Sequence, residues 1–143
     1  MNREITFRAK HGKEWVYGDL HLLSKMPHIH TNPFTKKSIN IETIGQCTGL
    51  KDKNGKEVYE GDILRGDEYP FNCDGKDNYF AEIVWADNLC GFYRITLKNP
   101  KSTVRGISHG IWEQLDEEDI KSFEVIGNIY DNKNLLGLSK VEL

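Results

Sequence analysis

The sequence predicts a mainly β protein, built as a small barrel or a sandwich of strands. Apolar and polar residues alternate in several short stretches, which is the period of a half-buried strand. Turn-forming residues separate these stretches, and no long stretch has the period of an amphipathic helix. Recurrent strands without long helices favour a barrel or sandwich over a doubly wound α/β fold.

The first part of the chain predicts an opening β-hairpin followed by a loop. Residues 4–9 alternate apolar and polar side chains, and residues 14–23 can form the return strand after a turn at residues 11–13. Residues 24–38 carry two prolines and many polar side chains. Because proline lacks a backbone donor and restricts the residue before it, we expect an extended loop there.

The middle of the chain predicts a tight turn, a bent strand and a long loop. Asn54 and Gly55 both tolerate positive φ, so they favour a hairpin turn. Residues 57–64 follow as a strand, and Gly61 within it indicates a bulge or a sharp bend. Residues 66–78 are polar, with two glycines and a proline, and are expected to form a loop.

The last part of the chain predicts more strands and one short helix. Residues 79–87 and 91–98 are expected to form a pair of strands. Residues 99–110 have the composition of a loop. Residues 116–121 are the best helix candidate, because acidic side chains suit a helix N-terminus. Residues 123–130 are expected to form the closing strand.

Composition limits the function classes. Nineteen basic and 22 acidic residues give a net charge of −3 over 143 residues. This balance does not favour binding to nucleic acid or to an anionic membrane by broad attraction. Cys47, Cys73 and Cys90 form no CxxC pair, so a zinc ribbon is not predicted and free thiols in a reducing compartment are expected. The start lacks the apolar core of a signal peptide.

An internal boundary, if one exists, is expected within residues 45–58. Residues 1–50 would then form an N-terminal β-rich extension, and residues 51–143 a barrel-like domain. A single compact unit is the alternative, since 143 residues suit either arrangement.

Three stretches of the sequence resemble a known family. They are REITFRA at the start, IGQCTGLKDKNGKEVYEGDIL in the centre and FEVIGNIYDN near the end. Together they resemble the YopX family of small bacteriophage and prophage proteins. The matching positions are Gly45, Gln46, Thr48, Gly49, Leu50, Asp52, Asn54, Gly55, Tyr59, Glu60, Gly61, Asp62, Ile63, Val125, Ile126, Gly127, Asn128, Ile129 and Tyr130.

The resemblance implies a fold and an origin, and no activity. It implies a phage-encoded protein in the cytoplasm of a bacterial host. It also implies an SH3-like barrel in the C-terminal part, to which the N-terminal β-hairpin would be an extension. Residues 20–40 and 66–78 match no motif of the family.

The central motif contains a candidate acidic site. In strand geometry Glu60 and Asp62 point the same way, and two like charges on one face favour water, a cation or a basic partner. The alternative is a polar corner in which Asp62 accepts hydrogen bonds from nearby backbone N–H groups. We favour the polar corner, because such bonding is common in turns.

Three histidines are the nearest approach to a metal site. His28 and His30 would share one face of an extended segment. Two imidazoles are too few for zinc, so His21 or Asp19 would have to fold back to join them. Histidines in a polar loop are usually exposed and unliganded, so we predict no metal ligand, and likewise no cofactor.

Other candidates have simpler explanations. His109 near Glu113 suggests a base beside an acid, but no nucleophile motif accompanies them. The acids at 116–119 are typical of a solvated helix start. Tyr93 and Arg94, with Lys98, could begin a surface on which bases stack, although aromatic residues of a small β protein are more often core. No catalytic residue is therefore predicted.

These observations favour a non-enzymatic accessory protein of unknown activity. It would act through protein–protein contacts or self-assembly, as a homo-oligomer or with a host or phage protein. A nucleic-acid-binding module is the alternative, and a metal-dependent hydrolase using His21, His28, His30 or Glu60 and Asp62 is a third. No membrane partner is predicted, because no apolar run approaches the roughly 18 residues of a spanning helix.

Overall fold

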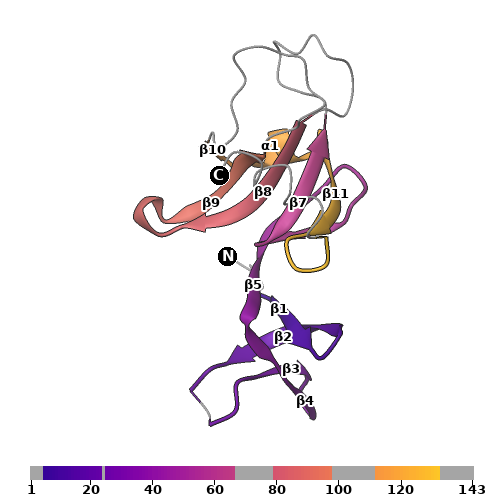
Figure 1. Cartoon of the computed structure of the whole chain (residues 1–143), viewed down its shortest axis with the longest axis vertical. Coiled ribbons are helices and arrows are strands. Elements are labelled where there is room, and N and C mark those ends of the chain that lie inside the picture. The colour runs from indigo at the N-terminus through magenta and orange to yellow at the C-terminus, as the bar shows by residue number, and fades with distance from the viewer. Residues whose placement is uncertain (1–4, 24, 67–78, 98–111, 133–143) are drawn as a thin grey trace. The chain divides into compact units, whose positions relative to one another are not determined.

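The chain divides into two compact units, Met1–Gly49 and Leu50–Leu143. The structure is a computed structural model, and it describes residues 5–23, 25–66, 79–97 and 112–132. Figure 1 shows that strands dominate both units, which confirms the prediction of a mainly β protein. Of the helices in these ranges, none has the length and apolar character needed to cross a membrane.

Antiparallel strands and two very short helical segments make up the described structure. Each unit has its own hydrophobic core. The strands are β1 (Phe7–His11), β2 (Glu14–His21), β3 (His28–Asn32), β4 (Thr35–Ser38), β5 (Asn40–Lys51), β6 (Glu57–Tyr59), β7 (Asp62–Gly66), β8 (Tyr79–Ala86), β9 (Gly91–Leu97), β10 (Trp112–Gln114) and β11 (Phe123–Asn128). The helical segments are η1 (Asp87–Leu89) and α1 (Glu117–Ile120).

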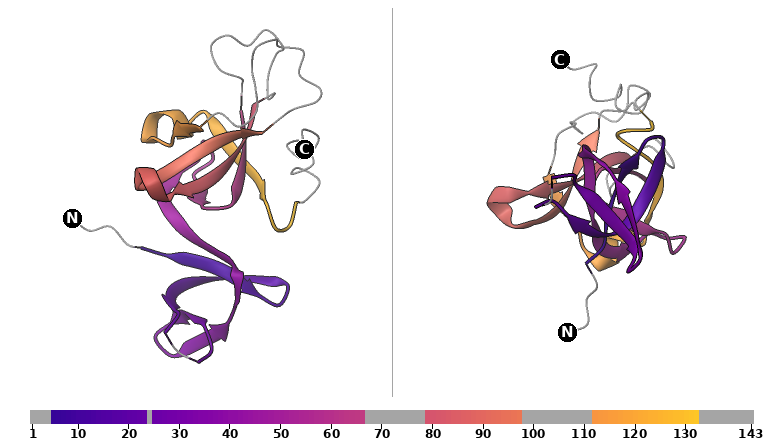
Figure 2. Two further views of the ribbon diagram at one scale, coloured as in Figure 1. Left: turned by 60° about the vertical axis from the view of Figure 1, so that its left-hand side comes forward. Right: turned by 90° about the horizontal axis from the view of Figure 1, so that it is seen from below.

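The N-terminal unit is built from hairpins. Its strands pair in the order β4-β3-β2-β1-β5, and Figure 2 shows how strongly they twist. β1 and β2 pair across a turn that includes Gly12, as the sequence predicts. Alternation turns Ala9, Val16 and Ile29 inward, and they form the small core of this unit.

The prediction of a loop over residues 24–38 is wrong, because β3 and β4 form a second hairpin there. The prolines flank β3 and do not interrupt it. Pro33 lies in the turn, where its missing donor costs no ladder hydrogen bond. The side-chain oxygen of Asn32 accepts a hydrogen bond from the N–H of Phe34 at 2.9 Å, which closes this turn.

The C-terminal unit contains an open five-stranded sheet of order β10-β9-β8-β7-β11. The described edge strands β10 and β11 do not pair with each other, so these residues do not confirm the expected SH3-like barrel. Alternation along β8 buries Ala81 and Ile83 in the core. The helix expected at 116–121 is present as α1, which packs Ile120 into the same core.

The strand expected over residues 57–64 is two strands, and the bend expected at Gly61 is real. β6 ends at Tyr59, a turn occupies Glu60 and Gly61, and β7 begins at Asp62. Gly61 has φ of +93°, a left-handed conformation that favours glycine.

Some predictions lie outside the described residues. They concern most of the loop at 66–78, the loop at 99–110, and the residues Cys73, Lys98 and His109.

Candidate functional site

The second and third strands bring three histidines together on one face of the N-terminal sheet. His21 ends β2 and His28 begins β3, and these two residues are direct cross-strand partners. His30 lies two residues beyond His28, so alternation places it on the same face. Leu20 and Ile29 pair on the opposite face and pack into the core of the unit.

The three imidazoles are close enough to share one ion. One ring nitrogen from each of His21, His28 and His30 lies within 4.8 Å of the other two. The Nε2 atoms of His28 and His30 are 3.2 Å apart. His28 and His30 are half-buried and His21 is exposed, so solvent reaches the cluster. No other such group of histidine, cysteine or acidic side chains occurs among the described residues.

A backbone hydrogen bond orients the His28 ring. Its Nδ1 lies 2.9 Å from the carbonyl oxygen of Met26. Because a carbonyl can only accept, Nδ1 must carry the proton, and the Nε2 of the neutral ring keeps its lone pair. That lone pair belongs to the nitrogen that faces His30.

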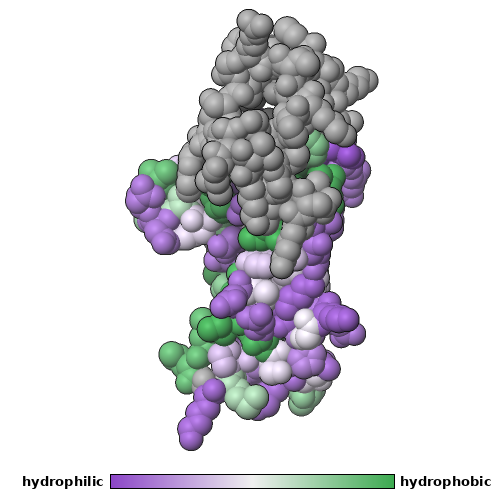
Figure 3. All heavy atoms as spheres, in the orientation of Figure 1, coloured by the Kyte–Doolittle hydropathy of each residue, from purple (hydrophilic) through white to green (hydrophobic). Residues whose placement is uncertain are grey.

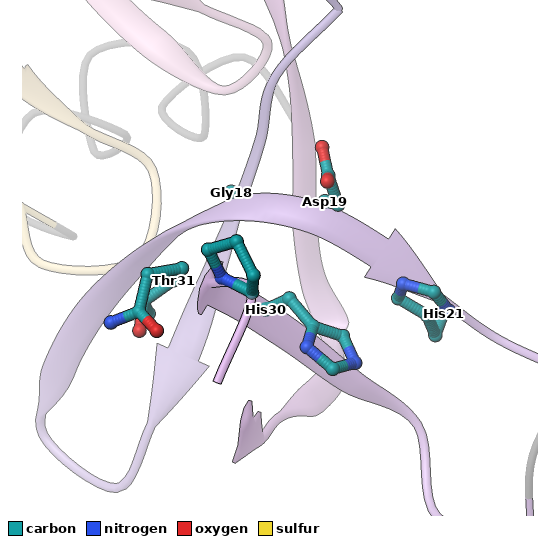
Figure 4. A pocket seen from close by; sticks show the side chains of 7 residues that line it. Gly18, Asp19, His21, His30 and Thr31 are labelled. Atoms are coloured by element: carbon teal, nitrogen blue, oxygen red, sulfur yellow. The ribbon is translucent and has the colours of Figure 1, made fainter. Parts of the chain in front are cut away.

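Surface hollows lie on either side of the histidine cluster. One, of about 380 Å³, is lined by Gly18, Asp19, His21, His30 and Thr31, with Asn32 and Pro33. Figure 4 shows Asp19, His21 and His30 around this hollow. Asp19 is the cross-strand partner of His30 and lines the same hollow, but its carboxylate is not among the groups that lie within 4.8 Å of one another, and His21 supplies the third imidazole. The other hollow, of about 360 Å³, is lined by Lys25, Met26, His28, Lys36 and Ser38.

Glu60 and Asp62 do not form an acidic site. Asp62 is buried, and its carboxylate accepts a hydrogen bond from the backbone N–H of Tyr59 at 2.7 Å. The polar corner is therefore the right interpretation of this part of the motif. The charge of Glu60 acts on Glu82 instead. Burial is the larger cause of the raised pKa of Glu82, and the negative charge of Glu60 is the second.

The remaining candidates have structural roles where the structure describes them. Arg94 is only 1% exposed and pairs with Glu113 at 2.6 Å and Asp119 at 3.4 Å. It cannot contribute to an exposed stacking surface, so that idea is wrong for Arg94. Asp116 caps α1 by accepting a hydrogen bond from the N–H of Asp119, which lowers the pKa of Asp116. Cys47 is buried and Cys90 is exposed.

Sequence reasoning named these three histidines but did not predict that they meet, because it treated residues 24–38 as a loop. Without a strand there, no register pairs His21 with His28. The signal that could have revealed it is short: alternation through His28, Ile29 and His30, ended by an Asn-Pro turn.

The apolar surface of the N-terminal unit is a second feature with functional potential. Nine large apolar side chains are exposed among the described residues, and seven of them belong to this unit. Leu23 and Phe34 are almost fully exposed. Figure 3 shows apolar side chains reaching the surface of this unit among hydrophilic ones. The seven are Ile5, Tyr17, Leu22, Leu23, Met26, Phe34 and Ile41.

Comparison with known proteins places the chain in a family. No curated protein matches it. The crystal structure of the protein EF1440 from Enterococcus faecalis is similar, with 26% sequence identity and a TM-score of 0.54. The match covers 94% of this chain and 99% of that chain. A family model, described as YopX protein, matches residues 6–137. That range includes the histidine cluster and all of the central motif, so the chain belongs to the YopX protein family.

Proposed function

We propose that this chain is a phage-encoded accessory protein that acts through protein–protein contacts, with a second copy of itself or with another phage or host protein. Membership of the YopX family supports the phage origin, and the cytoplasm of a bacterial host follows from that origin. The proposal is of a non-enzymatic protein.

The exposed apolar side chains of the N-terminal unit carry this proposal. Leu22, Leu23 and Met26 lie in the segment that joins β2 to β3, and Phe34 lies in the turn before β4. Large apolar groups left exposed at a surface can serve to dock another protein. A large side chain that is 97% exposed, as Phe34 is, gains free energy only when a partner covers it.

The edge of the same sheet argues against pairing by strand addition. β4 forms one edge of that sheet, and it carries Lys36 and Lys37. Lysines on an edge strand discourage a second strand from joining it. Side-chain contacts from Leu23 and Phe34 are therefore the better basis for association.

Sedimentation velocity over a concentration series, with affinity capture from phage-infected cells, tests the proposal. The variant with Leu23→Ser and Phe34→Ser removes two exposed apolar groups without touching a core. Leu89→Ser, at an exposed leucine of the C-terminal unit, is the matched control. We expect self-association or capture of a protein to weaken at least about tenfold in the double variant, a change of about 1.4 kcal/mol, and to survive in the control.

A wild-type chain that stays monomeric and captures the same proteins as the double variant would overturn the proposal. The nucleic-acid alternative is checked by titrating labelled DNA and RNA at low salt, where electrostatic attraction is strongest. Arg94 is buried and cannot contact a nucleic acid, which weakens the nucleic-acid alternative.

We also propose that the C-terminal unit forms an SH3-like barrel. Five antiparallel strands in the C-terminal unit support an SH3-like barrel. An experimental structure of the full chain tests it, and a sheet that stays open from β10 to β11 would contradict it.

A further inference from the structure

We propose that His21, His28 and His30 form a binding site for one divalent transition-metal ion of the zinc class, with a fourth coordination position open to solvent. The site does not depend on the proposed protein contacts. It rests on the register of β2 and β3, the spacing of the ring nitrogens and the orientation of His28.

The spacing of the nitrogens suits a tetrahedral metal. With metal–nitrogen bonds of about 2.0–2.1 Å, two ligands of a tetrahedral ion lie about 3.4 Å apart. The Nε2 atoms of His28 and His30 are already 3.2 Å apart. His21 is exposed and ends its strand, so its ring can move the short distance that remains from within 4.8 Å.

The ring packing agrees with this spacing. The centroids of the three imidazoles are 4.5 to 5.0 Å apart. Imidazoles bound to one tetrahedral ion would have centroids about 5 Å apart, by the same bond lengths. The centroid spacing therefore suits one shared ion, and the exposed His21 ring, which lies parallel to that of His28, would turn to direct its lone pair at it.

The hydrogen bond from His28 to Met26 provides the support that metal-binding histidines usually have. A ligating imidazole commonly donates its other N–H to a carbonyl or a carboxylate, which fixes the ring and directs the lone pair at the metal. Nδ1 of His28 donates to the Met26 carbonyl oxygen at 2.9 Å. Without metal, the Nε2–H of His30 can donate to Nε2 of His28. With metal, His30 would take its other tautomer and offer a lone pair instead.

The ligand set selects the class of ion. Three imidazoles suit zinc, cobalt, nickel and copper, whereas calcium and magnesium prefer oxygen ligands. Three protein ligands leave one tetrahedral position, which the hollow beside His21 and His30 opens to water or to a small ligand.

Metal binding would also hold together the two ends of the segment that joins β2 to β3. His21 and His28 flank residues 22–27 and face each other across the hairpin. An ion that joins them binds the folded chain, where the three imidazoles meet, and not the unfolded chain, so it stabilises the fold by mass action. Zinc is therefore expected to raise the melting temperature of the protein.

Isothermal titration calorimetry with zinc chloride, on the full chain without a histidine tag, tests the site. Cobalt(II) absorption serves as a second readout, because a tetrahedral site gives a characteristic visible spectrum. We expect one ion per chain. His28→Gln and His30→Gln should each weaken binding at least about tenfold, and binding should weaken at acidic pH because a ligating imidazole must be neutral.

His11→Gln is the matched control, since His11 lies in the same unit but outside the cluster and contacts Ser38. It should bind zinc as the wild type does. Circular dichroism and the melting temperature without metal show whether each variant is folded. If His28→Gln and His30→Gln unfold, His21→Gln tests the site instead, because it changes an exposed side chain. Absence of stoichiometric binding, or wild-type affinity in folded variants of the cluster, would overturn the proposal.

Discussion

Single residues of the family motif act as structural anchors. The buried carboxylate of Asp52 accepts hydrogen bonds from the backbone N–H groups of Asn54, Lys56 and Val125, each at 2.9 Å. The first two close the turn that includes Gly55, and the third connects this turn to β11. At the end of β11, the side-chain oxygen of Asn128 likewise closes a turn by accepting hydrogen bonds from the backbone N–H groups of residues 130 and 131. These motif residues therefore specify turns.

Replacing Asp52 with alanine should destabilise the C-terminal unit. Three backbone donors would lose their acceptor, and we expect a loss of about 2–4 kcal/mol in the free energy of unfolding. Asp52→Asn is the matched control, because its remaining oxygen can still accept from the turn, and it should cost less. Urea denaturation measures both, and an alanine variant as stable as the wild type would contradict this role.

Glu82 should destabilise the folded protein at neutral pH. Burial, and after it the charge of Glu60, raise the pKa of Glu82 above its ordinary value of 4.5. The unfolded chain therefore ionises this group more readily, and stability falls as the pH rises from about 4.5 through the raised pKa. Glu82→Gln should increase the free energy of unfolding at pH 7, and the gain should shrink below pH 4.5.

Denaturation of wild type and variant at pH 4 and pH 7 measures that difference. Glu57→Gln is the control at an exposed carboxylate of the same unit. A gain that is equal at both pH values would mean that ionisation of Glu82 is not its cause.

At the scale of elements, the sequence predicted strands better than it predicted their pairing. Strands were predicted correctly at β1, β8 and β11, and in β8 the alternation marks a buried face that carries Ala81 and Ile83. The β3–β4 hairpin was missed because the prolines that flank β3 were taken as signs of a loop throughout. The histidine cluster depends on the register of β2 with β3, and register follows from contacts between distant residues that a single stretch of sequence does not carry.

Gly18 should be essential for that register. An added Cβ would lie 1.9 Å from the carbonyl oxygen of His30, and φ of Gly18 is +150°. Gly18→Ala should therefore separate β2 from β3. Gly12→Ala is the control: φ is +64° but nothing lies within 4 Å, so only backbone strain of about 1 kcal/mol is expected.

Hydrogen exchange of the amides in β3 measures this effect. Protection of residues 28–32 should fall markedly in Gly18→Ala and stay near the wild-type level in Gly12→Ala. Equal protection in the two variants would show that β2 and β3 do not approach as closely as described.

At the scale of the whole molecule, the two units carry different features. The hydrogen-bonded anchors at Asp52, Asp62 and Asn128 belong to the C-terminal unit. Most of the exposed apolar groups, and the histidine cluster, belong to the N-terminal unit. We infer that the C-terminal unit maintains a shared fold and that binding is a property of the N-terminal unit.

A zinc titration followed by ¹H–¹⁵N correlation spectra of the full chain tests this division most directly. We predict that the largest changes fall on the amides of residues 17–32, around His21, His28 and His30, and that residues 50–66 and 123–132 stay unchanged. Changes centred on the motif residues, or no changes at stoichiometric zinc, would contradict it.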